Sequence, residues 1–279
     1  MPPARLDRTI LRLTGPDARS LLNGLLTQNL DLLDQAPVVY AGLLTPQGKV
    51  IADMLVWAAP DGVLIEADPA RGPDLLRRLT LYKLRAAVAI EDTSATHMVL
   101  VSDVAFEGAA PDPRLPALGF RSIAPRADAP AVDLEALHAK RLALGVPDLA
   151  ADAAAEEVFA LEALFEELNG VDFHKGCFVG QENVSRMKRR ATTRKKFCPI
   201  VFEGAAPSIG ESVRAGEAEL GSVRAVGAGR ALALLRLDRA LEALSRGGAL
   251  MAGETEVRLA APDWLILPEP PSAQDAAAS

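Results

Sequence analysis

Cysteine is scarce in this chain of 279 residues, and Cys177 and Cys198 are the only two. Two thiols cannot build a disulfide framework, and they are too few for an iron–sulfur or zinc site made by this protein alone. The three histidines, His97, His138 and His174, also lack the spacing of metal ligands. We therefore expect no metal site within the chain.

Long apolar runs are also missing, and none could cross a bilayer. The segment from Met1 to Arg5 lacks the apolar stretch of a secretory signal. These two absences predict a cytoplasmic protein without a membrane partner. A glycine-rich phosphate loop is absent too, which disfavours a kinase or a nicotinamide-dependent dehydrogenase. The net charge of -7 makes wholesale binding of nucleic acid an unfavoured function.

Strand and helix signals do alternate along the chain, but without a strict strand–helix–strand rhythm. This mixture favours an α+β fold with helices packed on a largely antiparallel sheet. Pro46 and Gly48 fit a type I turn between two apolar runs, and Pro73 fits the first turn of a helix. The patterns predict strands over residues 9–14, 38–44, 50–57, 63–67, 87–90, 97–106 and 120–123. They predict helices over residues 15–27, 72–82, 133–144 and 158–168.

The pattern of residues changes after Lys196. Short apolar segments alternate with glycine-rich turns, which is typical of a small antiparallel β-barrel. A helical segment is predicted within it, over residues 238–245. The tail from Pro268 is rich in Pro, Ala and Ser, and we expect it to be disordered.

The stretch from Lys175 to Glu182 concentrates residues suited to a polar site. Two glycines, Gly176 and Gly180, flank Cys177, and the following residues can continue as a helix. The positive end of a helix that starts near Gly180 would favour a thiolate in the loop before it, and the Lys175 ammonium acts in the same direction. Cys177 is therefore a candidate reactive thiol. The alternative is a small buried residue between glycines that only shape a turn.

The octapeptide Lys175-Gly176-Cys177-Phe178-Val179-Gly180-Gln181-Glu182 closely resembles the signature of YgfZ-type proteins. These are relatives of the glycine-cleavage T-protein, an aminomethyltransferase. Three further segments resemble the family in matched order: the opening Leu13 to Thr27, the hairpin Ala41 to Asp53, and Gly229 to Asp238 of the barrel.

The resemblance implies a multi-lobed α+β chain around a central folate-binding hole, with the barrel last. The lobes are expected at residues 1–95 and 96–194, the barrel at 195–268 and the disordered tail at 269–279. It further implies tetrahydrofolate as ligand, a role in assembling or repairing iron–sulfur proteins, and a link to tRNA modification. The expected partners are folate and iron–sulfur client or assembly proteins, and we expect a monomer.

One departure from the T-protein pattern bears on the activity. T-proteins carry two adjacent aspartates after the first hairpin, whereas this chain has Ala52-Asp53. Losing one carboxylate weakens the field that would steer a cationic amine intermediate. Folate-dependent aminomethyl or one-carbon transfer thus remains an alternative function, with Asp53 as its carboxylate.

The candidate site residues follow from the motif and the resemblance. Glu182 has the chemistry to accept two parallel N–H bonds from a pterin, although a first-turn acid at a helix start is nearly as good an interpretation. Gln181 would add an amide contact, and Lys175 would pair with a folate carboxylate or tune Cys177. The predicted catalytic residues are Cys177 and Lys175, and the predicted cofactor-binding residues are Asp53, Gly176, Gly180, Gln181, Glu182 and Arg186.

A basic run from Arg186 to Lys196 follows the motif. Such a run is usually a solvated helix face. In an acidic chain it also forms a local positive patch, so a protein or RNA interaction module is a third candidate function. Phe197 is the one aromatic residue next to the run, which gives little support to stacking of RNA bases.

Overall fold

The computed structural model describes residues 3–190 and 193–268, and these residues form two compact units. Unit 1 comprises residues 3–133, 149–160 and 165–185. Unit 2 comprises residues 134–148, 161–164, 186–190 and 193–268. The predicted lobe boundaries at residues 95 and 194 stay a prediction, and the predicted disordered tail from residue 269 lies outside the described residues.

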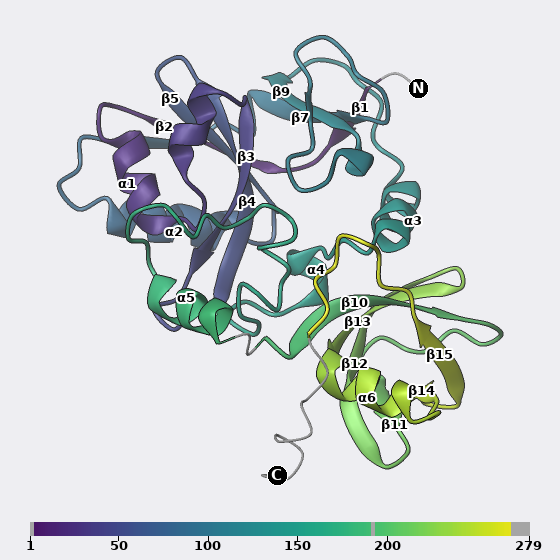
Figure 1. Ribbon diagram of the computed structural model, residues 1–279. Coiled ribbons are helices and arrows are strands. Elements are labelled where there is room, and N and C mark those ends of the chain that lie inside the picture. The colour runs from purple at the N-terminus through teal and green to yellow at the C-terminus, as the bar shows by residue number, and fades with distance from the viewer. Residues whose placement is uncertain (1–2, 191–192, 269–279) are drawn as a thin grey trace. The chain divides into compact units, whose positions relative to one another are not determined.

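A five-stranded antiparallel sheet with the order β3-β4-β5-β2-β6 forms the larger part of unit 1 (Figure 1). Its strands are β2 (Thr9–Thr14), β3 (Val38–Leu44), β4 (Val50–Ala59), β5 (Gly62–Ala67) and β6 (Ala89–Asp92). Helices α1 (Ala18–Leu25) and α2 (Gly72–Tyr82) pack on one face of this sheet through a shared apolar core. The 3-10 helix η1 (Leu30–Asp34) follows α1.

The spacing of leucines explains how the helices attach. Leu22 and Leu25 of α1, and Leu75 and Leu79 of α2, recur every three or four residues and are buried against the sheet. Burying one such side chain contributes about 1.5–3 kcal/mol. Both helices therefore pack against one apolar core, which they share with the inward-facing residues of the strands.

A second antiparallel sheet in unit 1 has the order β1-β7-β9-β8. It is built from β1 (Ala4–Leu6), β7 (His97–Ser102), β8 (Ala110–Pro111) and β9 (Phe120–Pro125), with the 3-10 helix η2 (Pro116–Leu118) before β9. Sequence reasoning extended the strand at His97 to residue 106, but the strand ends at Ser102, whose hydroxyl accepts the Val104 N–H in a bend.

β3 is buried along its whole length, so both of its faces are covered. One face meets the core under α1. On the other face Phe165 lies against Gly42, where an added Cβ would come within 2.4 Å of the Phe165 ring. Tyr40 stacks on the same ring, with centroids 5.2 Å apart. Gly42 is therefore needed for the close approach of Phe165 to the strand.

The helix predicted over residues 158–168 is wrong. The segment is a run of turns, in which Leu164 has a φ angle of 63°, and Asn169, directly after it, has a φ angle of 57°. Two carbonyls of the segment accept distant donors, Val158 from Val50 and Glu162 from Phe197, and its local bonds do not have helical spacing: the Phe165 N–H donates to the Ala160 carbonyl, five residues back. The leucines are buried as a helical pattern requires, but non-local partners and turn bonds take the place of the helical hydrogen bonds.

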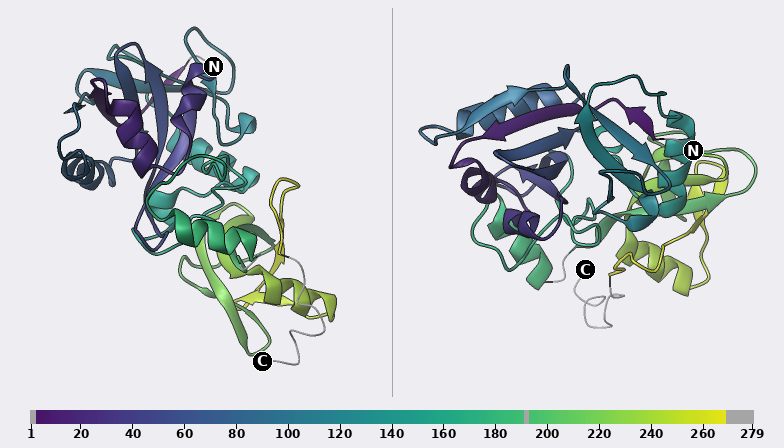
Figure 2. Two further views of the ribbon diagram at one scale, coloured as in Figure 1. Left: turned by 60° about the vertical axis from the view of Figure 1, so that its left-hand side comes forward. Right: turned by 90° about the horizontal axis from the view of Figure 1, so that it is seen from above.

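Unit 2 contains a closed barrel of six antiparallel strands with the order β10-β13-β12-β11-β14-β15 (Figure 2). The pairing of β10 with β15 closes it. The strands are β10 (Lys195–Phe202), β11 (Ser212–Ala215), β12 (Ala218–Gly227), β13 (Arg230–Arg236), β14 (Leu250–Ala252) and β15 (Thr255–Leu259). Helix α6 (Leu237–Ser245) follows β13 and precedes β14 in the sequence. The predicted barrel and its helix are confirmed.

Helix α3 (Leu134–Leu144) contacts the barrel. The His138 ring nitrogen Nε2 lies 3.0 Å from the Val226 carbonyl, and Leu142 packs where Gly227 has no side chain. His138 thus has a structural role. Two short helices complete the fold, α4 (Leu149–Asp152) in unit 1 and α5 (Gln181–Arg189) at the end of the cysteine motif.

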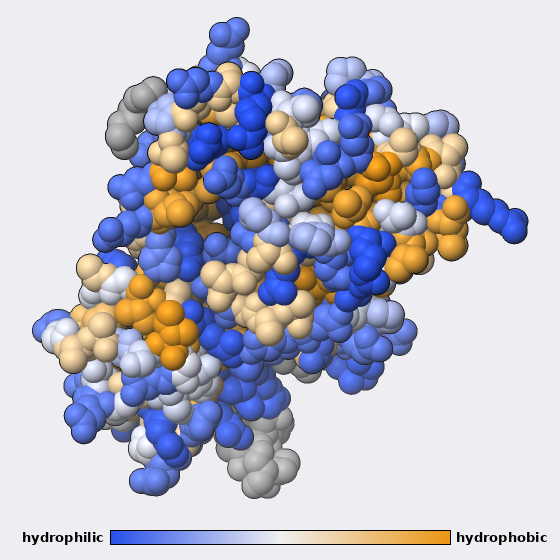
Figure 3. All heavy atoms as spheres, turned by 180° about the vertical axis from the view of Figure 1, so that it is seen from behind, coloured by the Kyte–Doolittle hydropathy of each residue, from blue (hydrophilic) through white to orange (hydrophobic). Residues whose placement is uncertain are grey.

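Polar side chains cover much of the face shown in Figure 3, with apolar groups between them. This agrees with a composition in which 24% of residues are charged. No helix among the described residues is both long and apolar enough to span a membrane.

Candidate functional site

The two cysteines have opposite environments. Cys177 is exposed on the loop before α5, whereas Cys198 is fully buried in β10 of the barrel. The alternative interpretation of Cys177 as a buried core residue is therefore wrong. The next residue, Phe178, is only 7% exposed, and its buried side chain anchors the loop to the protein. The thiol is thus presented to solvent by a backbone that is held in place.

Lys175 holds the loop to the segment after α1. Its Nζ donates to the carbonyls of Leu26 and Gln28, at 2.8 Å each, and lies 5.4 Å from the centre of the Phe178 ring. Burial lowers the pKa of Lys175 to about 8, and the charges of Asp172 and Asp31 oppose that shift. Sequence reasoning had Lys175 tuning Cys177 or pairing with a folate, and missed these carbonyls.

Thr27 and Gln28 secure the start of the same loop. The Thr27 hydroxyl donates to the Gly170 carbonyl and accepts the Gly42 N–H, and the Gln28 amide donates to the Asn169 carbonyl at 2.7 Å. Both side chains are buried. Because Gly42 belongs to β3, these bonds tie the loop directly to the central sheet.

Gly180 and Asn183 secure the other end of the loop. Gly180 has a φ of 84°, and an added Cβ would lie 2.6 Å from the Thr45 carbonyl. The Asn183 amide donates to the Gln47 carbonyl at 2.7 Å. The beginning of α5 therefore packs against the turn between β3 and β4. Cys177 lies between two anchored points of the chain, Lys175 on one side and Gly180 on the other.

The remaining predicted residues divide into two groups. Gly176, Glu182 and Arg186 are exposed, and Gln181 is half-buried at the start of α5. Asp53 lies on β4, where it pairs in register with Gly42 and accepts the Tyr40 hydroxyl at 3.0 Å. Gly42 thus connects Asp53 with the loop: it is paired with Asp53 in the sheet, and its N–H donates to the Thr27 hydroxyl.

A buried polar cluster that sequence reasoning missed continues from Tyr40. Arg114 lies over the Tyr40 ring, with 5.7 Å to its centre, and makes two hydrogen bonds to Asp112, at 3.0 and 2.8 Å. Burial raises the pKa of Tyr40, and the Asp53 carboxylate raises it further. Burial opposes ionisation of Asp112, but Arg114 and Arg121 outweigh it and hold the Asp112 pKa at about 2.

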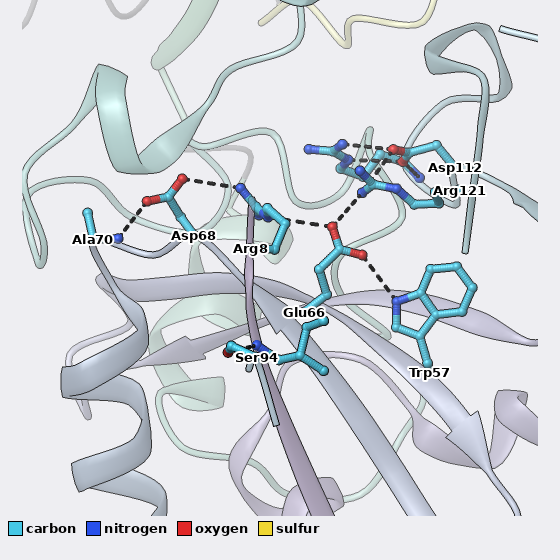
Figure 4. A network of polar contacts seen from close by, with 10 residues as sticks. Arg8, Trp57, Glu66, Asp68, Ala70, Ser94, Asp112 and Arg121 are labelled. Atoms are coloured by element: carbon cyan, nitrogen blue, oxygen red, sulfur yellow. Dashed lines mark hydrogen bonds and ion pairs between the residues drawn. The ribbon is translucent and has the colours of Figure 1, made fainter. Parts of the chain in front are cut away.

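Glu66 is the centre of the second half of this cluster (Figure 4). Its side chain is fully buried, and its carboxylate lies 3.5 Å from Arg8, 3.3 Å from Arg121 and 3.2 Å from the Trp57 indole nitrogen. The two arginine distances are those of ion pairs rather than of short hydrogen bonds. A glutamate in the otherwise apolar strand β5 was the available sequence signal.

A hollow of about 10 Å³ lies beside Asp53. This is room for about one water molecule, far less than a ligand the size of a folate needs. It is lined by Val50, Ile51, Ala52, Asp53, Arg71, Leu149, Ala153, Ala154 and Val158. Within the described part of the chain, no group of three or more His, Cys, Asp or Glu side chains could hold a metal ion.

Comparison with known proteins identifies the family. The sequence profile of the CAF17 C-terminal beta-barrel domain matches residues 194–266. A mouse protein, "Iron-sulfur cluster assembly factor IBA57, mitochondrial", is 30% identical over an alignment of 308 positions, covering 93% of this chain and 84% of its own. The chain belongs to the IBA57 family. The human IBA57 is 32% identical, covering 74% of this chain and 68% of its own.

The coverage differs among IBA57 relatives. The IBA57 homologue of Neurospora crassa is 31% identical over 73% of this chain, and that of Mycosarcoma maydis is 31% identical over 70%. The chain spans about half the length of these two fungal proteins, 54% and 55%.

The IBA57 assignment refines one prediction and overturns another. The resemblance to T-protein relatives is right at the level of the fold, but the member identified is IBA57 rather than YgfZ. The prediction of a cytoplasmic protein is wrong, because these relatives carry mitochondrial names. The absence of apolar runs, on which that prediction rested, does not distinguish the two compartments.

The fold of this IBA57 member is that of an aminomethyltransferase. The glycine cleavage system aminomethyltransferase T of Bartonella henselae superposes with a TM-score of 0.70 over 93% of this chain and 84% of its own. At 12% identity this likeness establishes the fold alone. The predicted α+β fold with a C-terminal barrel is confirmed.

Proposed function

We propose that this chain supports the assembly of iron–sulfur clusters in other proteins, with Cys177 as its working group. The relatives' names say that they are iron–sulfur cluster assembly factors. The observation that carries the proposal is the exposed thiol on a loop anchored at both ends. Cysteine thiolates are the usual ligands of iron–sulfur clusters.

A single thiol can contact a cluster but cannot enclose one. Iron–sulfur clusters use four protein ligands as a rule, and Cys198 is fully buried in the barrel. The cluster is therefore cargo that Cys177 shares with a partner protein, which supplies the other ligands. The anchors at Lys175 and Gly180 keep the thiol in one place for that encounter.

The test is rescue of cells whose own IBA57 gene is deleted. The chain, fused to a mitochondrial leader, is expected to restore the activity of an enzyme that carries a tetranuclear cluster. An enzyme without a cluster serves as the control and should stay unchanged. Failure to restore activity, with the chain present in normal amount, would count against the proposal.

We further propose that the chain binds tetrahydrofolate with Asp53 at the edge of the ligand. The support is chemical: a half-buried carboxylate can accept N–H groups of a pterin, and the fold is that of an aminomethyltransferase. The hollow beside Asp53 has room for about one water molecule, so it would not enclose a pterin ring, and Asp53 would hold the edge of a ligand bound outside it.

Calorimetric titration with tetrahydrofolate checks this ligand. Asp53→Asn keeps the shape of the side chain but removes its charge, and loss of a charge-assisted hydrogen bond should weaken binding about tenfold or more. Asp61→Asn, on an exposed turn, is the matched control and should bind as the wild type does. Equal affinity in both variants, or no binding by the wild type, would refute the folate proposal.

A further inference from the structure

One face of α5 is built from arginines. Arg186 and Arg189 belong to α5, and Arg190 follows it directly with its backbone N–H bonded to the Arg186 carbonyl. At this spacing of three and four residues the three side chains project from the same side, and all three are exposed. Val184 is buried and lies on the opposite side of the helix. We call Arg186, Arg189 and Arg190 the arginine face; it points away from the packed side of α5.

The arginine face stands out against the charge of the whole chain. Seven of the thirty Lys and Arg residues fall within positions 186–196, and no Asp or Glu occurs between Glu182 and Glu203. The net charge of the chain is nevertheless -7. Outside this run, acidic residues are in clear excess. Lys196 is buried and bonds the Ile266 carbonyl, but the exposed arginines of this run form a local positive region on a protein of net negative charge.

Helix stability does not account for this arrangement. Arginines near a helix C-terminus gain about 0.3–1 kcal/mol from the helix dipole. Like charges at helical spacing lose about 0.2–0.5 kcal/mol for each pair. The two effects largely offset one another, so neither the helix dipole nor like-charge repulsion decides where these arginines lie.

The chemistry and spacing of the face fit carboxylates. Each guanidinium presents a fork of N–H donors that matches a carboxylate in two parallel hydrogen bonds. Arg186 and Arg190 are separated by about 6 Å along the helix axis, from a rise of about 1.5 Å per residue. Alternate residues of an extended chain are about 6.6 Å apart. An extended segment with acidic residues at every second position therefore matches the face.

Nucleic acid fits less well. Recognition of single strands relies on aromatic side chains on which the bases stack. The one aromatic residue among the described residues of 181–190 and 193–198 is Phe197, and it is fully buried. The acidic remainder of the chain would also repel a long polyanion more than a short peptide.

We propose that the arginine face is a docking surface for an acidic segment of a partner protein. The naming of that partner as an iron–sulfur protein or an assembly protein rests on the proposed function. The docking itself does not, because it follows from the charge and geometry of α5 alone. It adds a recognition element that lies one turn beyond the Cys177 motif in sequence.

The docking is tested with a labelled peptide that carries glutamates at alternate positions, followed by fluorescence anisotropy at low salt. The triple variant Arg186→Glu, Arg189→Glu, Arg190→Glu should bind at least tenfold more weakly than the wild type. The matched control reverses three exposed arginines of unit 2, Arg230→Glu, Arg246→Glu and Arg258→Glu. It changes the net charge equally and should lose less than threefold.

Three results would overturn the docking surface. One is an equal loss in both triple variants, which would mean that only net charge acts. Another is tighter binding of a short oligouridylate than of the peptide, which would assign the face to nucleic acid. The third is unchanged binding in a variant with glutamine at all three positions, which removes the charges without introducing repulsion. Circular dichroism verifies that each variant is folded.

The rescue assay separates this inference from the proposed function. If the wild type restores the cluster enzyme and the Arg186, Arg189 and Arg190 triple variant does not, the partner belongs to cluster assembly. Full rescue by that variant would overturn this naming of the partner. Failure of the wild type to rescue, combined with specific peptide binding, would refute the assembly role and leave the docking surface intact.

Discussion

One thiol per native chain is expected to react rapidly with an aromatic disulfide reagent near pH 8, and the second only after unfolding. Cys177 is exposed, so the reagent reaches its sulfur directly. Cys198 is fully buried, and burial raises its pKa to about 12. Near pH 8 that leaves about one thiolate in ten thousand at Cys198, and the reagent cannot reach it in the closed barrel.

The measurement is the absorbance of the released thiol, first in buffer and then in concentrated guanidinium. Cys177→Ala should remove the fast phase completely, and Cys198→Ala should leave it unchanged while removing the slow thiol. Two fast thiols in the native wild type would mean that the barrel opens readily. No fast thiol would mean that Cys177 is covered in solution, which would contradict the proposal that its thiol is accessible to a cluster.

Replacing Glu66 with alanine is expected to lower the free energy of unfolding of unit 1 by about 3–5 kcal/mol. The carboxylate is fully buried between Arg8 and Arg121. Its removal takes one partner from the buried Arg121, which keeps Asp112, and one from the partly buried Arg8, which keeps Asp68, and it leaves the Trp57 indole N–H without its acceptor. Asp61→Ala breaks the exposed pair with Arg12 and is the control. It should cost no more than about 1 kcal/mol.

Urea unfolding followed by tryptophan fluorescence measures both values. The chain has two tryptophans, Trp57 in β4 and Trp264 in unit 2. In a Trp264→Phe background, Trp57 alone reports on unit 1. A loss of less than about 1 kcal/mol for Glu66→Ala would show that water reaches the arginines and that the cluster is not a closed polar core.

The fold could be predicted largely from local signals. Pro46 and Gly48 set the hairpin turn, and the Gly48 N–H does bond the Thr45 carbonyl. Pro73 lies at the first turn of α2 as predicted. The error at residues 158–168 has the opposite origin. Its buried leucines imitate a helix, but its carbonyls bond strands β4 and β10, which are distant in the sequence.

Helix starts were less accurate for a related reason. The first helix was predicted from residue 15 but begins at Ala18. Gly15 has a φ of 112°, and the Asp17 carboxylate accepts the N–H of Ala87 instead of capping the helix. Local rules predict that the Asp17 side chain caps this helix, but in the folded chain it accepts a hydrogen bond from a residue 70 positions away.

The site was predictable in its centre and not in its surroundings. The glycines and polar residues around Cys177 marked the motif, and the predicted helix after Gly180 is α5. The bonds of Lys175 to Leu26 and Gln28 span 149 and 147 positions, so no local pattern indicates them. Arg121 and Arg114 join the cluster for the same reason, since only the folded chain brings Arg121 to Glu66 and Arg114 to the Tyr40 ring.

The central claim is that the Cys177 thiol does the work of cluster assembly. The most direct test expresses the wild type, Cys177→Ala and Cys198→Ala in cells whose own IBA57 gene is deleted, at equal protein levels. The measured quantity is the activity of a tetranuclear-cluster enzyme. The account predicts restored activity with the wild type and Cys198→Ala, and the activity of uncomplemented cells with Cys177→Ala. Full activity with Cys177→Ala would contradict it.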